Sequence, residues 1–185
     1  FGKSKSLENS LSPFEYATYL NDIIPPEINT FVGHSFGGRV AVHLSFLREI
    51  NNLVLIGVPL LRITPKKRFV NKLTLFKNLN KFGLVSSATV ESIKNKTGSF
   101  DYRNSQGVMR ETLVKAVNDD LEDKLPNIKS NVKLVWGEND MDVPVSIAEK
   151  SQKLISNSEL TIIPNQGHNM LRSNPISVFE VLKSL

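Results

Sequence analysis

The sequence predicts an α/β fold, in which helices cover a parallel sheet and a helical segment interrupts the alternation. Three observations lead to this prediction. Short extended runs alternate with helical patterns at both ends of the chain, as in parallel sheets. Residues 53–56, Leu-Val-Leu-Ile, are apolar throughout, as expected of a strand buried on both faces. Between residues 59 and 130 the alternation stops and the pattern is helical only.

The first part of the chain contains two predicted helices and two predicted strands. Ser12-Pro13-Phe14-Glu15 predicts a helix start, because serine caps a helix, proline suits its first position and glutamate completes a capping box. Pro25-Pro26 ends this helix. A strand at 29–32, a second helix from Phe36 and the strand at 53–56 follow.

Later residues supply the helical segment and then a return to alternation. Helical patterns without a strong strand signal occur at 67–81, 88–95 and 105–118. Strands are then predicted at 132–136 and 160–163, and Pro144 and Pro175 each open a helix.

Composition excludes several classes of protein. The chain has 185 residues, enough for one domain with a substantial core, and its 40% hydrophobic and 22% charged residues are ordinary globular values. No apolar run is long enough to span a bilayer, and no secretory signal is visible. The sequence has no cysteine, which excludes disulfides, thiolate metal sites and a cysteine nucleophile. We therefore expect a cytoplasmic protein.

The main chemical signal is Gly33-His34-Ser35-Phe36-Gly37-Gly38. It follows a short strand and opens a helix, which is the context that a Gly-x-Ser-x-Gly motif requires. In that context the serine occupies a strained turn, and its hydroxyl is exposed at the carboxyl edge of the sheet. The N–H of Phe36 then points to where an oxyanion would form, and the helix N-terminus adds a favourable potential there. Ser35 is the candidate nucleophile and Phe36 a candidate oxyanion donor.

A serine nucleophile needs a base, and the sequence has three histidines. His34 lies inside the turn, and His43 lies in the middle of a helix, where a packing role is expected. His168 follows the last predicted strand and the loop Pro164–Gly167, from which it can swing over the sheet edge towards Ser35. His168 is therefore the candidate base.

The acid that orients the base is expected on the loop after the preceding strand. Glu138, Asp140 and Asp142 lie there. Only one of them needs to face His168, and the others would be solvated or would cap the helix that Pro144 opens. The order serine, acid, histidine is that of one hydrolase architecture and differs from the chymotrypsin and subtilisin orders. On these grounds alone the choice among the three carboxylates stays open.

Together these motifs resemble the α/β-hydrolase superfamily along almost the whole chain. Residues 1–4 resemble the end of the family's G-x-G-x-S loop, 33–38 its nucleophile elbow, 136–144 its G-x-x-D-x-x-x-P acid loop, and Gly167-His168 the G-H before its final helix. The resemblance implies Asp140 as the acid. It also implies a core in residues 1–58, a helical cap insertion in 59–130 and a second core part in 131–185.

The resemblance implies a serine hydrolase that cleaves an ester or another acyl-type bond of a small-molecule acyl substrate through an acyl-enzyme. Its catalytic residues would be Ser35, Asp140 and His168, with no metal or organic cofactor. A carbon–carbon bond hydrolase or an acyltransferase with the same triad, and a non-catalytic binding protein on this fold, are the alternatives. A nucleophilic aspartate, as in dehalogenases and epoxide hydrolases, is disfavoured because position 35 is serine.

In the family, further strands precede the nucleophile elbow, and the loop after one of them supplies a second oxyanion N–H. The four strands predicted here would be adjacent in the family's order, which leaves the strand at 29–32 as an unpaired, aggregation-prone edge. The chain begins at Phe1 rather than at a methionine. We therefore expect a part of a larger hydrolase domain, without the N-terminal part of its sheet, that carries the triad and half of the oxyanion hole.

The net charge of +5 is concentrated in residues 62–81, whose charged side chains are all basic: Arg62, Lys66, Lys67, Arg68, Lys72, Lys77 and Lys81. Phe69, Leu73 and Phe76 would form one apolar face of the predicted helix. The favoured interpretation is a cap helix that packs over the site with a solvated lysine face. Contact with an anionic substrate or a membrane surface is the alternative. Nucleic acid is not an expected partner, because the patch is short and no recognition motif accompanies it.

Overall fold

The computed structural model describes residues 5, 7–62, 78–82, 85–86, 89 and 104–183. The chain divides into two compact units, Phe1–Glu8 with Thr64–Leu113, and Asn9–Ile63 with Val114–Leu185. Thr64–Leu113 falls inside the predicted insertion, whose boundaries at 59 and 130 stay a prediction. The likeness of residues 1–4 to a family loop lies outside the described residues, as does the basic stretch 63–77.

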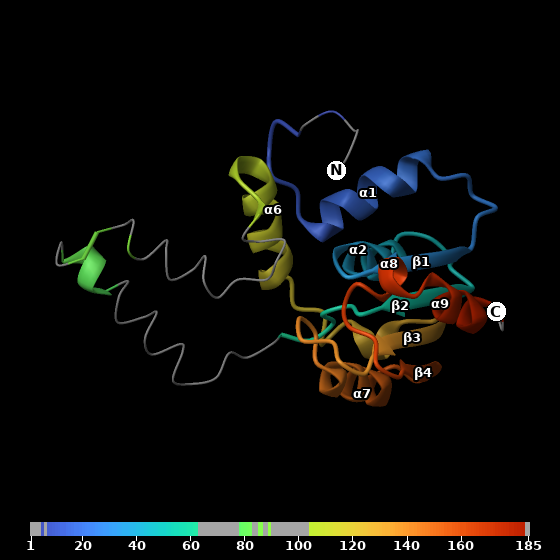
Figure 1. The fold of residues 1–185 in the computed structure, drawn as a ribbon. Helices are drawn as coiled ribbons and strands as arrows, with labels where there is room; N and C mark the ends of the chain where they lie inside the picture. The colour runs from blue at the N-terminus through green and yellow to red at the C-terminus, as the bar shows by residue number, and fades with distance from the viewer. Residues whose placement is uncertain are drawn as a thin grey trace. The chain divides into compact units, whose positions relative to one another are not determined.

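The second unit contains a sheet of four parallel strands (Figure 1). Its strands are β1 (Thr30–His34), β2 (Asn52–Ile56), β3 (Asn131–Gly137) and β4 (Ser158–Ile163). They lie side by side in sequence order, and each neighbouring pair is parallel. The predicted α/β class, with a parallel sheet and adjacent strands, is confirmed. Because the strands are parallel, the loops that leave their carboxyl ends meet at one edge of the sheet.

The helices of this unit match the predicted ones, with two short additions. They are α1 (Pro13–Ile23), α2 (Phe36–Leu44), the 3-10 turn η1 (Leu125–Asn127), α7 (Val145–Leu154), α8 (Met170–Ser173) and α9 (Pro175–Leu182). Only η1 and α8 were not expected. A further helix, α6 (Gly107–Asn118), runs across the division between the two units.

Two predicted helices fall largely outside the described residues. Of the helices predicted at 67–81 and 88–95, residues 78–81 and 89 are described, and these are helical. None of the helices in the described ranges has the length and hydropathy that a membrane crossing needs.

The sheet has an apolar core on each face. Leu53 and Leu55 of β2 belong to a cluster that also contains apolar side chains of α1, α2 and α7. Val54 and Ile56 belong to a second cluster, with α8 and α9. All four of these β2 side chains are 0% exposed. The strand is therefore buried on both faces, as its unbroken apolar run predicted.

A row of polar side chains crosses the amino ends of the strands. Asn52 Nδ2 donates to Thr30 Oγ1 at 3.3 Å, and Asn131 Nδ2 donates to Asn52 Oδ1 at 3.4 Å. Asn157 Nδ2 donates to Asn131 Oδ1. Thr30, Asn52 and Asn131 are also register partners in the backbone ladder. Since a slip of one residue would break these bonds and reverse the buried faces, the row helps to fix the strand register.

Strand β1 lies at an edge of the sheet. Its strand partner within the described residues is β2 alone, and the Val32 side chain is 50% exposed. The predicted open edge is thus present in the described part of the chain. Open edges of this kind favour pairing with other chains, so aggregation remains the expectation for this strand.

The predicted capping box at the start of α1 is confirmed. Ser12 Oγ accepts the Glu15 N–H at 3.2 Å, and Glu15 Oε2 accepts the Ser12 N–H at 2.6 Å. Pro13 occupies the first helical turn. The hydrogen bonds from the Ser12 backbone and hydroxyl lower the pKa of the Glu15 carboxyl, because they favour its charged form. Two of the otherwise unpaired N–H groups around the helix start are satisfied in this way.

Ser12→Ala removes one acceptor of this box and is expected to lower the free energy of unfolding by about 1 kcal/mol. Urea denaturation followed by circular dichroism measures the change. Ser10→Ala, two residues earlier and outside the helix, is the matched control and should unfold like the wild type. Equal unfolding midpoints for both variants would contradict a stabilising role of the box.

Candidate active site

The backbone changes from strand to helix at a single residue, Ser35. Its φ is 50° and its ψ is −116°, and it separates the end of β1 from the start of α2. A positive φ is uncommon and strained in a residue other than glycine. The Ser35 N–H still donates to the Ile56 carbonyl at 3.0 Å, so the strand ladder continues to the turn itself. This is the strand–turn–helix context that the sequence motif requires.

Close packing around the turn excludes side chains at two glycines. A Cβ on Gly33 would lie 2.5 Å from Gly38 Cα, and a Cβ on Gly38 would lie 2.1 Å from Val58 Cγ2. By contrast, in the described part of the chain no atom lies within 4 Å of a Cβ built on Gly37. The steric constraint therefore falls on Gly33 and Gly38, and not on the second glycine of the Gly-x-Ser-x-Gly pattern.

Three predicted site residues form one hydrogen-bonded chain. Ser35 Oγ lies 3.0 Å from His168 Nε2, and His168 Nδ1 lies 2.8 Å from Asp140 Oδ2. The Asp140 side chain is fully buried, and 11% of the His168 side chain is exposed. The three residues come from loops that follow β1, β3 and β4. A base in contact with a hydroxyl on one side and a carboxylate on the other can take up the hydroxyl proton.

Only Asp140, of the three carboxylates on the acid loop, contacts His168. Its second oxygen, Oδ1, accepts the N–H groups of Asp142 and Val143 at 3.0 and 2.7 Å. Asp142 is exposed and contributes its backbone to this arrangement. Glu138 accepts the Asn165 N–H at 2.9 Å. Both oxygens of the Asp140 carboxylate are therefore hydrogen-bonded, one to His168 and one to the backbone of its own loop.

His168, the candidate base, follows β4, whereas Ser35 follows β1. β1 and β4 are separated by three strand spacings, roughly 14 Å at about 4.8 Å each. The histidine loop covers this distance over the ends of β2 and β3, where Gly57 directly follows β2 and Gly137 is the last residue of β3. A Cβ on Gly137 would lie 2.4 Å from the Gln166 carbonyl oxygen. A Cβ on Gly57, whose φ is +54°, would lie 3.2 Å from both Asp140 Oδ2 and His168 Nδ1.

Hydrogen bonds join the acid loop to the histidine loop. The Glu138 N–H donates to the Ile163 carbonyl at 3.0 Å, and the Asn139 N–H donates to the Gln166 carbonyl at 2.7 Å. The Asn165 N–H donates back to the Glu138 carboxylate, and Asn165 has a left-handed φ of 57°. Glu138 is a site residue whose role the sequence did not reveal, because its partner lies on a distant loop.

Phe36, the predicted oxyanion donor, is the first residue of α2. Its backbone N–H belongs to the helix N-terminus, whose partial positive charge favours an anion. Its ring meets the Tyr16 ring edge to face, with centroids 5.3 Å apart. Burial raises the pKa of the Tyr16 hydroxyl.

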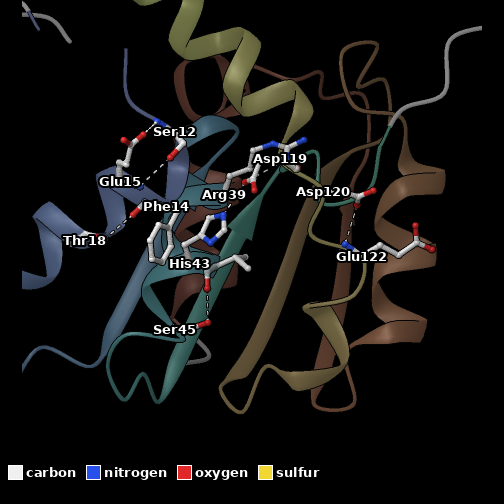
Figure 2. A network of polar contacts seen from close by, with 11 residues as sticks. Ser12, Phe14, Glu15, Thr18, Arg39, His43, Ser45, Asp119, Asp120 and Glu122 are labelled. Atoms are coloured by element: carbon white, nitrogen blue, oxygen red, sulfur yellow. Dashed lines mark hydrogen bonds and ion pairs between the residues drawn. The ribbon is translucent and has the colours of Figure 1, made fainter. Parts of the chain in front are cut away.

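The remaining polar residues of α2 form a separate buried network (Figure 2). Arg39 and His43 are each 4% exposed. His43 Nε2 lies 2.8 Å from Asp119 Oδ2, and Arg39 Nη1 donates to the Asp119 carbonyl. Burial lowers the pKa of Arg39, and the charges of Asp119 and Asp120 oppose this shift. The edge of the Phe14 ring packs against His43. His43 is thus engaged with Asp119, away from the Ser35 chain, in keeping with its expected packing role.

Within the described ranges, no group of three or more histidine, cysteine, aspartate or glutamate residues has the arrangement of a metal site.

Known proteins resemble this chain in structure rather than in sequence. No family model matches it, and no curated protein sequence matches it. An esterase from Exiguobacterium antarcticum superposes with a TM-score of 0.72 at 21% identity, covering 100% of this chain and 77% of the esterase. An α/β hydrolase enzyme from a metagenome of sediments of the Mar Chica lagoon, Morocco, gives a TM-score of 0.66 at 20% identity, with 98% and 72% covered.

A third similar structure comes from a protein with a different printed activity. The meta-cleavage product hydrolase of Pseudomonas fluorescens IP01 gives a TM-score of 0.66 at 16% identity, covering 98% of this chain and 74% of that protein. At such low identities the likeness establishes the fold. Together with the parallel sheet and the strand–turn–helix at Ser35, it identifies the architecture of this chain as the α/β-hydrolase fold.

Proposed function

We propose that this protein is a serine hydrolase that cleaves an ester or another acyl-type bond of a small-molecule substrate. The observation that carries the proposal is the hydrogen-bonded chain from Ser35 through His168 to Asp140, with Ser35 on a strained turn at the start of a helix. An ordinary surface serine has neither an imidazole at hydrogen-bond distance nor a buried carboxylate behind that imidazole.

In the proposed reaction, Ser35 Oγ attacks the substrate carbonyl carbon while His168 Nε2 takes the hydroxyl proton. The carbonyl oxygen becomes an oxyanion next to the Phe36 N–H at the start of α2. His168 then gives its proton to the leaving alcohol, and the acyl group stays on Ser35. Water attacks the acyl-enzyme, again with His168 as base, and the acid is released. Asp140 holds the imidazole in the tautomer with hydrogen on Nδ1 and stabilises the imidazolium.

A fluorophosphonate probe is expected to label Ser35, because an activated serine attacks phosphorus as it attacks a carbonyl. Mass spectrometry of the digested protein locates the label. Ser35→Ala should abolish labelling and nearly all ester turnover, whereas Ser156→Ala, at an exposed serine elsewhere, should change neither. A folded wild-type protein that never labels would overturn the proposal.

Asp140→Asn is expected to lower kcat about 10³- to 10⁴-fold, because an amide does not fix the productive imidazole tautomer. Asp142→Asn is the matched control, since the exposed Asp142 contributes its backbone N–H, which asparagine keeps. Hydrolysis of p-nitrophenyl butyrate measures both variants. If Asp142→Asn were the more damaging change, the acid would have been assigned to the wrong residue.

Gly57→Ala is expected to lower kcat by about 10- to 100-fold, because a methyl group would press on the hydrogen bond between Asp140 and His168 and misplace the base. Gly107→Ala is a control for the general effect of alanine at a left-handed φ. Gly107 has a similar φ of +52°, yet no atom lies near its Cβ position in the described part of the chain. Equal losses of kcat in the two variants would show that the contact at Gly57 is unimportant.

The second candidate function is hydrolysis of an activated carbon–carbon bond by the same triad. The observation that favours it is the structural likeness to a meta-cleavage product hydrolase. Ester substrates and vinylogous diketone substrates, assayed side by side with Ser35→Ala as the blank, distinguish the two. Turnover of the diketone alone would favour carbon–carbon hydrolysis.

A further inference from the structure

His34, which directly precedes the candidate nucleophile, contacts the candidate base, although His34 ends β1 and His168 follows β4. Its Nε2 lies 2.9 Å from the backbone carbonyl oxygen of His168, a residue 134 positions later in the chain. The two imidazole rings also pack together, with centroids 4.9 Å apart and planes tilted by 41°. The proposed reaction leaves this contact without a role.

The chemistry of the contact fixes its direction. A carbonyl oxygen only accepts hydrogen bonds, so the hydrogen must be on His34 Nε2. The acceptor belongs to the main chain of His168, whose ring nitrogens are already engaged with Asp140 and Ser35. His168 is therefore held at its backbone by His34 and at its ring by two other residues.

Two hydrogen bonds and one peptide bond link these residues in a closed circuit. Ser35 Oγ bonds to His168 Nε2, the His168 carbonyl oxygen bonds to the His34 side chain, and a peptide bond joins His34 to Ser35. The bonds of Asn165 and Gln166 tie the histidine loop to the acid loop after β3, whereas the His34 bond ties His168 to the segment that carries Ser35. Displacements of about 1 Å at such positions are enough to cost roughly 100-fold in rate.

We infer that His34 is a positioning residue: its Nε2–H holds the main chain of His168 and thereby keeps the imidazole aimed at the Ser35 hydroxyl. The inference rests on the proposed serine hydrolase function and adds a fourth side chain to it. His34 does not touch the reacting atoms and exchanges no proton in the reaction.

Two substitutions test the inference. His34→Phe keeps an aromatic ring against His168 but has no N–H, whereas His34→Gln keeps an N–H donor at a similar reach. In His34→Phe, the kcat for p-nitrophenyl butyrate and the rate of fluorophosphonate labelling are expected to fall by about 10- to 100-fold. KM and the thermal unfolding midpoint should change little. His34→Gln should recover most of both rates.

Several outcomes would overturn the inference. These are a folded His34→Phe that keeps the wild-type kcat and labelling rate, or a change confined to KM. Equal losses in His34→Phe and His34→Gln, together with lowered unfolding midpoints, would assign His34 a packing role instead.

Nitrogen NMR of the imidazole rings separates this inference from the proposed function, because it needs no turnover. A neutral His34 should carry its hydrogen on Nε2, and His34→Phe should shift the ring signals of His168. A wild-type protein that is not labelled and does not hydrolyse ester overturns the hydrolase proposal. A neutral His34 whose hydrogen is on Nδ1, so that Nε2 has none, overturns the positioning role.

Discussion

The one-residue turn between β1 and α2 determines the geometry of the whole site. A Cβ on Gly33 would overlap Gly38 at the start of α2, and a Cβ on Gly38 would overlap the Val58 side chain. Ser35 must therefore make the entire change of direction, with a positive φ that costs on the order of 1–3 kcal/mol. Burial of apolar residues of α2 and of the neighbouring strand β2 in one cluster offsets this cost. As a result, the Ser35 hydroxyl and the N-terminal amides of α2 lie at the same edge of the sheet.

A second constraint follows from the parallel sheet. The carboxyl ends of the four strands lie at one edge, yet Ser35 follows β1 and His168 follows β4, three positions away in the sheet. The histidine loop has to cross the two central strands close to their backbones, at Gly57 just after β2 and at Gly137 at the end of β3, where a side chain would meet the loop. His168 reaches Ser35 because three features place it there: the two glycines leave room for the loop, Asp140 binds the imidazole, and hydrogen bonds join the acid loop to the histidine loop.

Helix α2, whose start is strained, is held further along its length by polar contacts of two buried side chains. Arg39 and His43 are buried and bind the backbone and carboxylate of Asp119, just after α6. Buried polar groups of this kind are destabilising unless they are paired, so the network ties α2 to the residues that follow α6. Helix α2, which begins just after Ser35, is thereby held in the core by apolar packing and by this network.

The sequence by itself determined the elements and the residue types of the site. Capping at Ser12, the apolar run of β2 and the glycine-rich turn at Ser35 are local patterns, and local patterns suffice to predict helices, strands and a nucleophile motif. Three features became visible only in the tertiary structure: the hydrogen bond of His168 to Asp140, the lack of space for a side chain at 38 but not at 37, and the contact between His34 and His168. Each depends on contacts between residues that are distant in the chain. In the sequence, two nearby aspartates or two adjacent glycines look alike, and only the fold brings one of each pair into contact with a distant residue.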